Sequence, residues 1–232
     1  MAAYVKPESG GGVLLQAEPS PLEIELNKTA VIVIDMQNAF VSKGGMFDLW
    51  GRDILKSQEA IEPIKNINNT ARAKGLKVIY VVHMYAPDLS NSGGPNSPNW
   101  NKRTLTNYRA NPEWRDKLTI SGTWGSEIVH ELKPQEGDIL VVKPRYSAFF
   151  GTNLDTILKT YSIRFLIFVG VATNICVESS ILDSFQLEYF PILVSDAVAS
   201  SGPPFMQEAA IHNIKSCYGW ITTSTNIMEV MG

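Results

Sequence analysis

Short, continuous runs of apolar and β-branched residues recur along the chain and predict the strands of a buried sheet. Four strong runs cover residues 30–34, 78–82, 139–142 and 165–169, and weaker runs cover residues 191–194 and 220–222. Strands that are apolar on both faces are typical of a mostly parallel sheet with helices on each side. The pattern therefore predicts an α/β protein.

Segments in which apolar residues follow helical spacing separate these runs. Residues 61–71 carry an apolar stripe with Pro63 in the predicted first turn, where proline is tolerated, and Gly75 follows as a predicted carboxyl-terminal cap. Three further helices are predicted from residues at helical spacing: Leu154, Ile157 and Leu158; Cys176, Ser180, Asp183 and Leu187; and Phe205, Ala209 and His212. Strands that alternate with helices predict a three-layer α/β sandwich.

Residues 84–125 break this alternation. The segment is long and rich in Asn, Pro, Gly and Ser, and it carries several large aromatic residues: Trp100, Tyr108, Trp114 and Trp124. A connection of this length is usually disordered or functional, and the aromatic residues argue against disorder. We therefore expect a lid or a binding loop.

The rest of the chain is organised as one domain. Residues 1–26 contain a run of three glycines and several prolines, and they are predicted to be an N-terminal extension that wraps the domain or a partner subunit. Residues 27–232 are predicted to form the domain itself, since no repeat or low-complexity tract divides them.

Composition narrows the classes of partner. The 20 Lys and Arg residues nearly balance the 23 Asp and Glu residues, and a net charge of −3 offers no basic surface to nucleic acid or an anionic membrane. The chain lacks an apolar run of the ~18 residues that a membrane helix needs, and residues 1–20 do not resemble a secretory signal. Two cysteines cannot form a disulfide framework. We expect a cytoplasmic protein that binds neither nucleic acid nor membrane.

Polar residues follow the predicted strands, at the sheet edge where parallel sheets bind ligands. Asp35, His83 and Lys143 each end a strand, and Cys176 lies just after the turn that follows the fourth strong run. A carboxylate can take a thiol proton and return it to a leaving nitrogen, while an ammonium group and a helix N-terminus favour a thiolate. Backbone N–H groups around Ala172 and Cys176 can stabilise an oxyanion. We therefore predict catalysis by Cys176, Asp35 and Lys143.

Each of these residues also has a purely structural interpretation. A lone cysteine is often a buried apolar residue, an aspartate often forms a turn, and a lysine after a strand is usually solvated. The combination of Asp35, Lys143 and Cys176 at the ends of different strands favours catalysis. Cys217 lacks such a setting and is interpreted as structural, while His83 is either a substrate contact or a structural histidine.

Three segments resemble the signatures of the isochorismatase-like cysteine hydrolases: Val-Ile-Val-Ile-Asp-Met-Gln-Asn-Ala-Phe at 31–40, Lys-Pro-Arg-Tyr-Ser-Ala-Phe at 143–149 and Gly-Val-Ala-Thr-Asn-Ile-Cys-Val-Glu at 170–178. The resemblance covers residues 28–231 in order and spacing. It implies a six-stranded parallel sheet of order 3-2-1-4-5-6 and a triad of Asp35, Lys143 and Cys176. It further implies a cis peptide between Val171 and Ala172, and a homodimer or homotetramer.

Differences between the enzymes of this family narrow the range of activities expected for this chain. Isochorismatases proper cleave a vinyl ether and lack the cysteine that this chain has at Cys176. Nicotinamidases are similar to the chain in the triad but add an Asp-x-His pair and a further His as metal ligands. The corresponding segment, residues 81–87, holds only His83, and His130 and His212 lie elsewhere. Since a metal site needs several convergent ligands, we expect no metal and no cofactor.

The chain also resembles the ureidoacrylate amidohydrolases of pyrimidine degradation, in residues 93–99, 143–150 and 187–190. It departs from their pattern where substrate is expected to bind, since His83, Tyr85 and Asn91 stand where the pattern has Asn, Trp and Glu. The resemblance implies a metal-independent cysteine amidohydrolase that cleaves a small carbamoyl or ureido amide through a thioester.

Two alternatives stay open. The substrate is another small amide, of the biuret, N-carbamoylsarcosine or maleamate type, or the fold is a non-catalytic binding or interaction module. For the enzyme, we predict that four aromatic side chains and a histidine line the substrate pocket: Phe40, His83, Tyr85, Trp100 and Tyr146. Arg145 is a candidate for binding a substrate carboxylate, although a surface salt bridge is the simpler interpretation.

Overall fold

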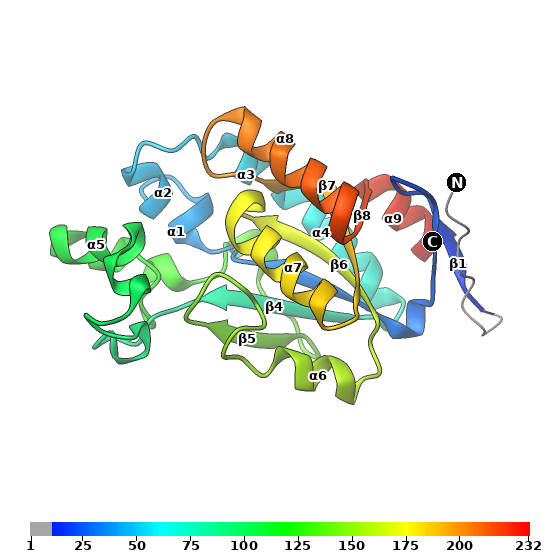
Figure 1. Ribbon diagram of the computed structural model, residues 1–232, viewed down its shortest axis with the longest axis horizontal. Coiled ribbons are helices and arrows are strands. Elements are labelled where there is room, and N and C mark those ends of the chain that lie inside the picture. Colours follow the sequence, from blue (N-terminus) through cyan, green and yellow to red (C-terminus); the bar gives the residue numbers. More distant parts are fainter. Residues whose placement is uncertain (1–10) are drawn as a thin grey trace.

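A six-stranded parallel sheet forms the centre of the computed structural model, which describes residues 11–232 (Figure 1). Its strands lie in the order β5-β4-β3-β6-β7-β8. Their bounds are Thr29–Ile34 (β3), Lys77–His83 (β4), Ile139–Lys143 (β5), Phe165–Val171 (β6), Phe190–Ala199 (β7) and Trp220–Thr222 (β8). Counted from β3, this is the order 3-2-1-4-5-6, so the predicted α/β class, the six strands and their order are confirmed.

Strand β3 shows why its sequence is apolar throughout. All six of its residues are buried. Val31 and Val33 pack into one core cluster, whereas Ala30, Ile32 and Ile34 pack into another. Successive side chains of a strand point to opposite faces, so a continuous apolar run is what a strand covered on both faces requires.

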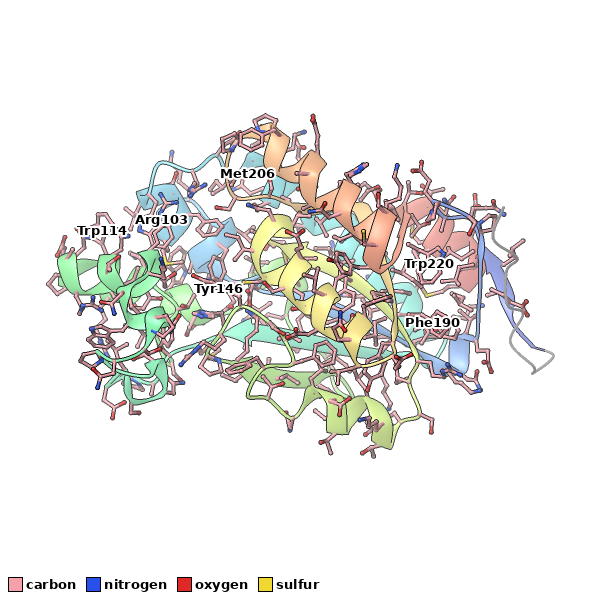
Figure 2. All side chains as sticks on the ribbon, in the orientation of Figure 1. Arg103, Trp114, Tyr146, Phe190, Met206 and Trp220 are labelled. Atoms are coloured by element: carbon pink, nitrogen blue, oxygen red, sulfur yellow. The ribbon has the colours of Figure 1, made fainter. Side chains whose placement is uncertain are left out.

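Helices cover both faces of the sheet and complete the three layers (Figure 1). Helices α3 (Leu55–Glu59), α4 (Ile61–Ala73) and α9 (Ser224–Met231) pack on one face. The other face is covered by α6 (Leu154–Thr160), α7 (Glu178–Gln186) and α8 (Pro204–Asn213). The carboxyl ends of the strands point away from the C-terminus, toward Arg103 and Tyr146, while Phe190 and Trp220 lie at the opposite end (Figure 2).

Helix α4 follows its predicted boundaries. It begins at Ile61, which places Pro63 in the first turn, and its buried stripe contains Ile64 and Ile67. Gly75 lies just beyond the end of the helix and has a φ of +75°. The N–H of the next residue, Leu76, donates to the carbonyl of Ala71 over 2.9 Å. This left-handed carboxyl-terminal cap favours glycine.

Helix α8 is present, but the residues that suggested it do not pack in the core. Phe205 is 64% exposed, and Ala209 and His212 are also exposed. The helix buries Ala210 instead, and the π-helical turn Ile214–Tyr218 that continues it buries Ile214. Helical spacing alone therefore identified the helix but not the face that packs.

The segment of residues 84–125 is not a simple loop, because it contains the helix α5 (Arg103–Ala110) and several short 3₁₀ turns. It lies beyond the carboxyl ends of the strands (Figure 1). Leu105 and Tyr108, three positions apart, are both buried and attach α5 to the rest of the protein. Apolar residues at helical spacing were therefore present in this polar segment, but the stretch that they cover is short.

The described part of the predicted extension packs on its own chain. Strands β1 (Val13–Leu15) and β2 (Leu22–Ile24) form an antiparallel pair, and Leu15 and Ile24 are fully buried in one of the core clusters. Residues 1–10 lie outside the described residues, and the domain boundary at residue 26 stays a prediction. Within residues 11–232, no helix is long and apolar enough to cross a membrane.

Candidate active site

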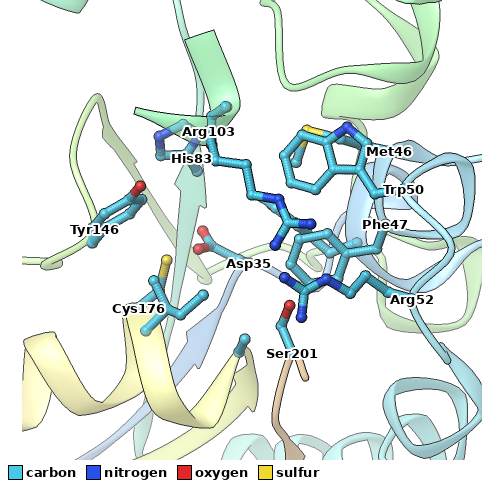
Figure 3. A pocket seen from close by; sticks show the side chains of 14 residues that line it. Asp35, Met46, Phe47, Trp50, Arg52, His83, Arg103, Tyr146, Cys176 and Ser201 are labelled. Atoms are coloured by element: carbon cyan, nitrogen blue, oxygen red, sulfur yellow. The ribbon is translucent and has the colours of Figure 1, made fainter. Parts of the chain in front are cut away.

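The side chains of Asp35, Lys143 and Cys176 meet at the carboxyl ends of the strands. Lys143 Nζ lies 2.8 Å from Asp35 Oδ2, and the charges of both side chains act on the Cys176 thiol. Asp35 and Lys143 are fully buried, and Cys176 is 7% exposed. Figure 3 shows the Asp35 carboxylate beside the Cys176 sulfur. The structure therefore brings together three residues that are far apart in the sequence.

The backbone at the end of β3 positions Asp35. Asp35 has a φ of +50° and donates its N–H to the carbonyl of Val81 on β4 over 2.9 Å. Beside it, Gly170 of β6 has a φ of +110°, and a β-carbon there would collide with the carbonyl oxygen of Ile34. Only glycine allows this close approach, which brings the turn after β6 next to Asp35.

A tight turn after β6 positions Cys176. The peptide bond between Val171 and Ala172 is cis. The Ala172 carbonyl accepts hydrogen bonds from the N–H groups of Ile175 and Val177 at 3.0 and 3.2 Å, and these bonds hold the π-helical turn Thr173–Val177. Ala172 and Cys176 both line the cavity in front of the sheet edge.

Two polar side chains join the elements around the site. The Ser180 hydroxyl donates to the Cys176 carbonyl over 2.6 Å and accepts the Ala148 N–H at 2.9 Å, which connects the Cys176 turn to the loop after Lys143. The buried Gln37 amide accepts the N–H of His83 and donates to its carbonyl, at 2.9 and 3.1 Å. Both contacts restrict how far the groups at the site can move apart.

Burial controls the protonation of the three groups. Burial raises the pKa of Asp35, against the lowering effect of the Lys143 ammonium. Although burial lowers the pKa of Lys143, Asp35 and Cys176 together hold it above its usual value. Burial and the neighbouring carboxylate also raise the pKa of the Cys176 thiol. Burial therefore favours a neutral Cys176 thiol beside the Asp35–Lys143 ion pair, in contrast to the thiolate that the sequence suggested.

This protonation state predicts the order in which the two cysteines react with an alkylating reagent. Cys217 is exposed, whereas Cys176 is buried and neutral, and the thiolate is the reactive form. Brief treatment with iodoacetamide at neutral pH should modify Cys217 first, as measured by peptide mass spectrometry. Faster modification of Cys176 would show that its thiol is ionised before substrate binds.

A cavity of about 540 Å³, measured with its open mouth, lies over Asp35 and Cys176. Phe40, His83 and Tyr146 line it, as predicted. Tyr85 and Trp100 are not among its lining residues: Tyr85 lies fully buried against the His83 ring at a centroid distance of 4.7 Å, and Trp100 packs under the Arg109 guanidinium at 4.2 Å. Packing within the segment of residues 84–125 holds both aromatic side chains away from the cavity.

The sequence analysis missed most of the other wall of the cavity. It is formed by residues from four segments: Met46, Phe47, Trp50 and Arg52; Arg103 and Thr104; Ile175; and Ser201. Met46, Phe47, Trp50, Arg52, Arg103 and Thr104 lie in long connections away from the strand ends, so the strand-end criterion does not find them. Ile175 and Ser201 do follow β6 and β7, but neither carries a charged or nucleophilic group that would have singled it out. Arg145, the predicted carboxylate ligand, instead donates to the carbonyls of Asn91 and Pro144 at 3.1 and 2.7 Å.

His83 lines the cavity and belongs to a chain of buried hydrogen bonds. The Tyr108 hydroxyl accepts the Thr119 N–H at 2.8 Å, and the proton of that hydroxyl can be donated to Thr119 Oγ1, 2.6 Å away. Thr119 Oγ1 in turn lies 2.9 Å from His83 Nδ1, so its own proton is free for that nitrogen. Burial lowers the pKa of His83 well below its ordinary value, which keeps the ring neutral.

This order of donors places the ring hydrogen on Nε2, which is buried and has no protein partner within residues 11–232. The same described residues contain no group of three or more His, Cys, Asp or Glu side chains that could hold a metal ion.

Comparison with known proteins agrees with the fold. The isochorismatase domain family matches residues 29–226. Ureidoacrylate amidohydrolase RutB of Caulobacter segnis is 46% identical over 233 residues, with 100% of this chain and 98% of that protein covered.

Two solved structures are also similar. The cysteine hydrolase of Pseudomonas syringae pv. phaseolicola has a TM-score of 0.73 and 26% identity, covering 90% of this chain and 94% of that chain. N-carbamoylsarcosine amidase of Thermoplasma acidophilum has a TM-score of 0.64 and 27% identity, covering 85% and 96%. With its domain match spanning most of the residues, this chain belongs to the isochorismatase family.

Proposed function

We propose that this protein is a metal-independent cysteine amidohydrolase that cleaves a small carbamoyl or ureido amide through a thioester on Cys176. Its family and its amidohydrolase relatives make it a hydrolase of non-peptide carbon–nitrogen bonds. The observation that carries the finer proposal is the position of the Cys176 sulfur beside Asp35, which lines the cavity and is paired with Lys143 (Figure 3).

The first step forms the sulfur–carbon bond. Because the resting thiol is neutral, its proton moves to Asp35 as the sulfur attacks the substrate carbonyl carbon. The carbonyl oxygen gains the negative charge, and the backbone N–H groups of Ala172 and Cys176 are proposed to donate to it. The carbon–nitrogen bond then breaks, and Asp35 gives its proton to the leaving nitrogen.

The second step restores the thiol. Water attacks the acyl group on Cys176 and transfers a proton to Asp35. The sulfur–carbon bond breaks, and Asp35 returns that proton to the sulfur. With a ureido substrate the enzyme-bound acyl group is a carbamoyl group, and the products are an amine and carbamic acid. One water is consumed in each turnover.

Lys143 has two proposed roles in this sequence. Its 2.8 Å contact with Oδ2 holds the Asp35 carboxylate in one orientation, as charge-assisted hydrogen bonds do. Its positive charge also stabilises the negative charge that passes to the sulfur during attack, and this stabilisation is strengthened because Lys143 is fully buried.

Partitioning of the acyl-enzyme provides the test of this mechanism. Two substrates that share a carbamoyl group, 3-ureidoacrylate and 3-ureidopropionate, would form the same carbamoyl-enzyme. With hydroxylamine as a competing nucleophile, we expect the same ratio of hydroxyurea to carbamic acid products from both. A ratio that depends on the leaving amine would exclude the common intermediate.

Metal independence is tested separately, by measuring the rate of amide hydrolysis. Activity should be unchanged after dialysis against a chelator. A loss of rate that added Zn²⁺ restores would contradict this part of the proposal.

The alternatives make different predictions. Ammonia release from 3-ureidoacrylate, N-carbamoylsarcosine, maleamate and biuret distinguishes the substrate classes, and a non-catalytic module would release none from any of them. The homodimer or homotetramer implied by the family resemblance stays a prediction, which the mass in solution would test.

A further inference from the structure

Two arginines reach into the cavity and have no acidic partner. Figure 3 shows the guanidinium groups of Arg52 and Arg103 pointing into the cavity, on the far side of Asp35 from Cys176. Among residues 11–232, neither makes a salt bridge or a side-chain hydrogen bond. By contrast, Arg72 pairs with Asp138 at 2.7 Å. The cavity therefore holds two cationic groups whose donors are unused.

Neighbouring residues place the two guanidinium groups. The Arg103 guanidinium stacks over the Trp50 ring at 5.2 Å, an arrangement that stabilises a cation and orients its plane. Arg52 packs against Gly202, where a β-carbon would lie 3.1 Å from Nη1 and 2.6 Å from the Met206 sulfur. The Trp50 ring thus supports Arg103, and the missing side chain at Gly202 leaves space for Arg52, so both guanidinium groups can lie at the cavity.

The charge balance of the cavity points to an anionic ligand. The one carboxylate that lines it, Asp35, is already paired with Lys143. Its remaining wall is largely apolar and includes Phe40 and Phe47. Arg52 is partly buried and Arg103 is exposed, so both can offer donors to a ligand that enters the cavity. The planar fork of arginine fits a carboxylate through paired hydrogen bonds.

We propose that Arg52 and Arg103 bind a carboxylate of the substrate, so that the enzyme acts on amides of small organic acids. This inference rests on the proposed function, since it places the acid group opposite the sulfur that attacks the amide. It favours ureido acids and acids of the N-carbamoylsarcosine or maleamate type over biuret, which has no carboxylate.

The test compares an acid with an uncharged relative of similar shape. The substrates are 3-ureidoacrylate and its methyl ester, and the readout is the ratio of their kcat/KM values. The wild-type protein should prefer the acid by about 100-fold or more, because charge-assisted hydrogen bonds contribute roughly tenfold or more each. Arg52→Gln and Arg103→Gln should each reduce the ratio about tenfold, and the double variant should remove the preference.

Arg109→Gln is the matched control. Arg109 lies on the same helix as Arg103, but it donates to the Trp100 carbonyl over 2.9 Å and does not line the cavity. Its variant should keep the wild-type ratio, and Arg103→Lys should keep more of the preference than Arg103→Gln. Thermal melts of each variant confirm that it is folded.

A binding measurement separates this inference from the proposed mechanism. In the Cys176→Ala protein, calorimetry should detect binding of 3-ureidoacrylate and at least tenfold weaker binding of its methyl ester. Adding Arg52→Gln and Arg103→Gln to this protein should abolish binding of the acid. Equal ratios for wild type and the double variant, or equal binding of acid and ester, would overturn the carboxylate site. Turnover that survives Cys176→Ala would overturn the mechanism alone.

Discussion

Replacing Cys176 with alanine is expected to lower kcat for amide hydrolysis by about 10⁴-fold or more, as removal of other catalytic nucleophiles does. Without the sulfur no acyl-enzyme forms, and only substrate binding and the oxyanion donors remain. Stability should change by only about 1 kcal/mol, because the thiol is neutral and its loss leaves the Asp35–Lys143 pair intact. Ammonia release and a denaturant titration measure the two effects.

The second cysteine is the control for this substitution. Cys217 is exposed and lies outside the cavity, so Cys217→Ala should retain the full rate. Cys176→Ala protein that is folded and hydrolyses the amide within tenfold of the wild-type rate would contradict covalent catalysis.

Replacing Lys143 with methionine should both abolish activity and destabilise the fold by roughly 3–5 kcal/mol. Lys143 is fully buried and supplies the counter-charge of Asp35, whose other oxygen, Oδ1, has no hydrogen-bond partner among the described residues. The methionine would leave a buried carboxylate without compensation. Chemical denaturation of the variant, together with its rate of ammonia release, measures both losses.

The pH dependence of this loss has a definite sign. In Lys143→Met the pKa of Asp35 rises further, because the ammonium that lowered it is gone. A carboxyl whose pKa is higher in the folded state stabilises the fold most when it is protonated, and that contribution is lost as pH rises. The stability deficit of the variant should therefore narrow as pH falls toward about 3.9, the ordinary pKa of aspartate.

A double variant separates charge from catalysis. Asp35→Asn combined with Lys143→Met removes both buried charges, and it should recover much of the stability that Lys143→Met loses. It should recover no activity, since neither the proton acceptor nor the ammonium remains. Stability that does not recover would show that Lys143 acts through packing rather than through its charge.

Much of the fold and the three converging residues could be predicted from the sequence, for a local physical reason. Apolar runs specify strands buried on both faces, and parallel strands bring their carboxyl ends to one edge. Asp35 and Lys143 stand at those ends, and Cys176 follows the turn after another strand. Their convergence is therefore a consequence of strand pattern and connectivity, without any knowledge of side-chain packing.

The rest of the cavity depends on how long connections fold. Arg52 and Arg103 come from connections whose course no periodic pattern specifies, and they reach the cavity because of Trp50 and Gly202. Trp100 belongs to the same segment as Arg103 and packs elsewhere. Residue type and spacing alone do not distinguish these two outcomes.

The protonation state of the Cys176 thiol likewise depends on the tertiary structure. From sequence, Cys176 beside a lysine and a helix start suggested a thiolate, because those local effects lower its pKa. Complete burial and the Asp35 carboxylate have the opposite effect and prevail. Local pattern thus determined which groups meet in this protein, whereas three-dimensional burial determined their charge, since desolvation depends on every segment that closes over the site.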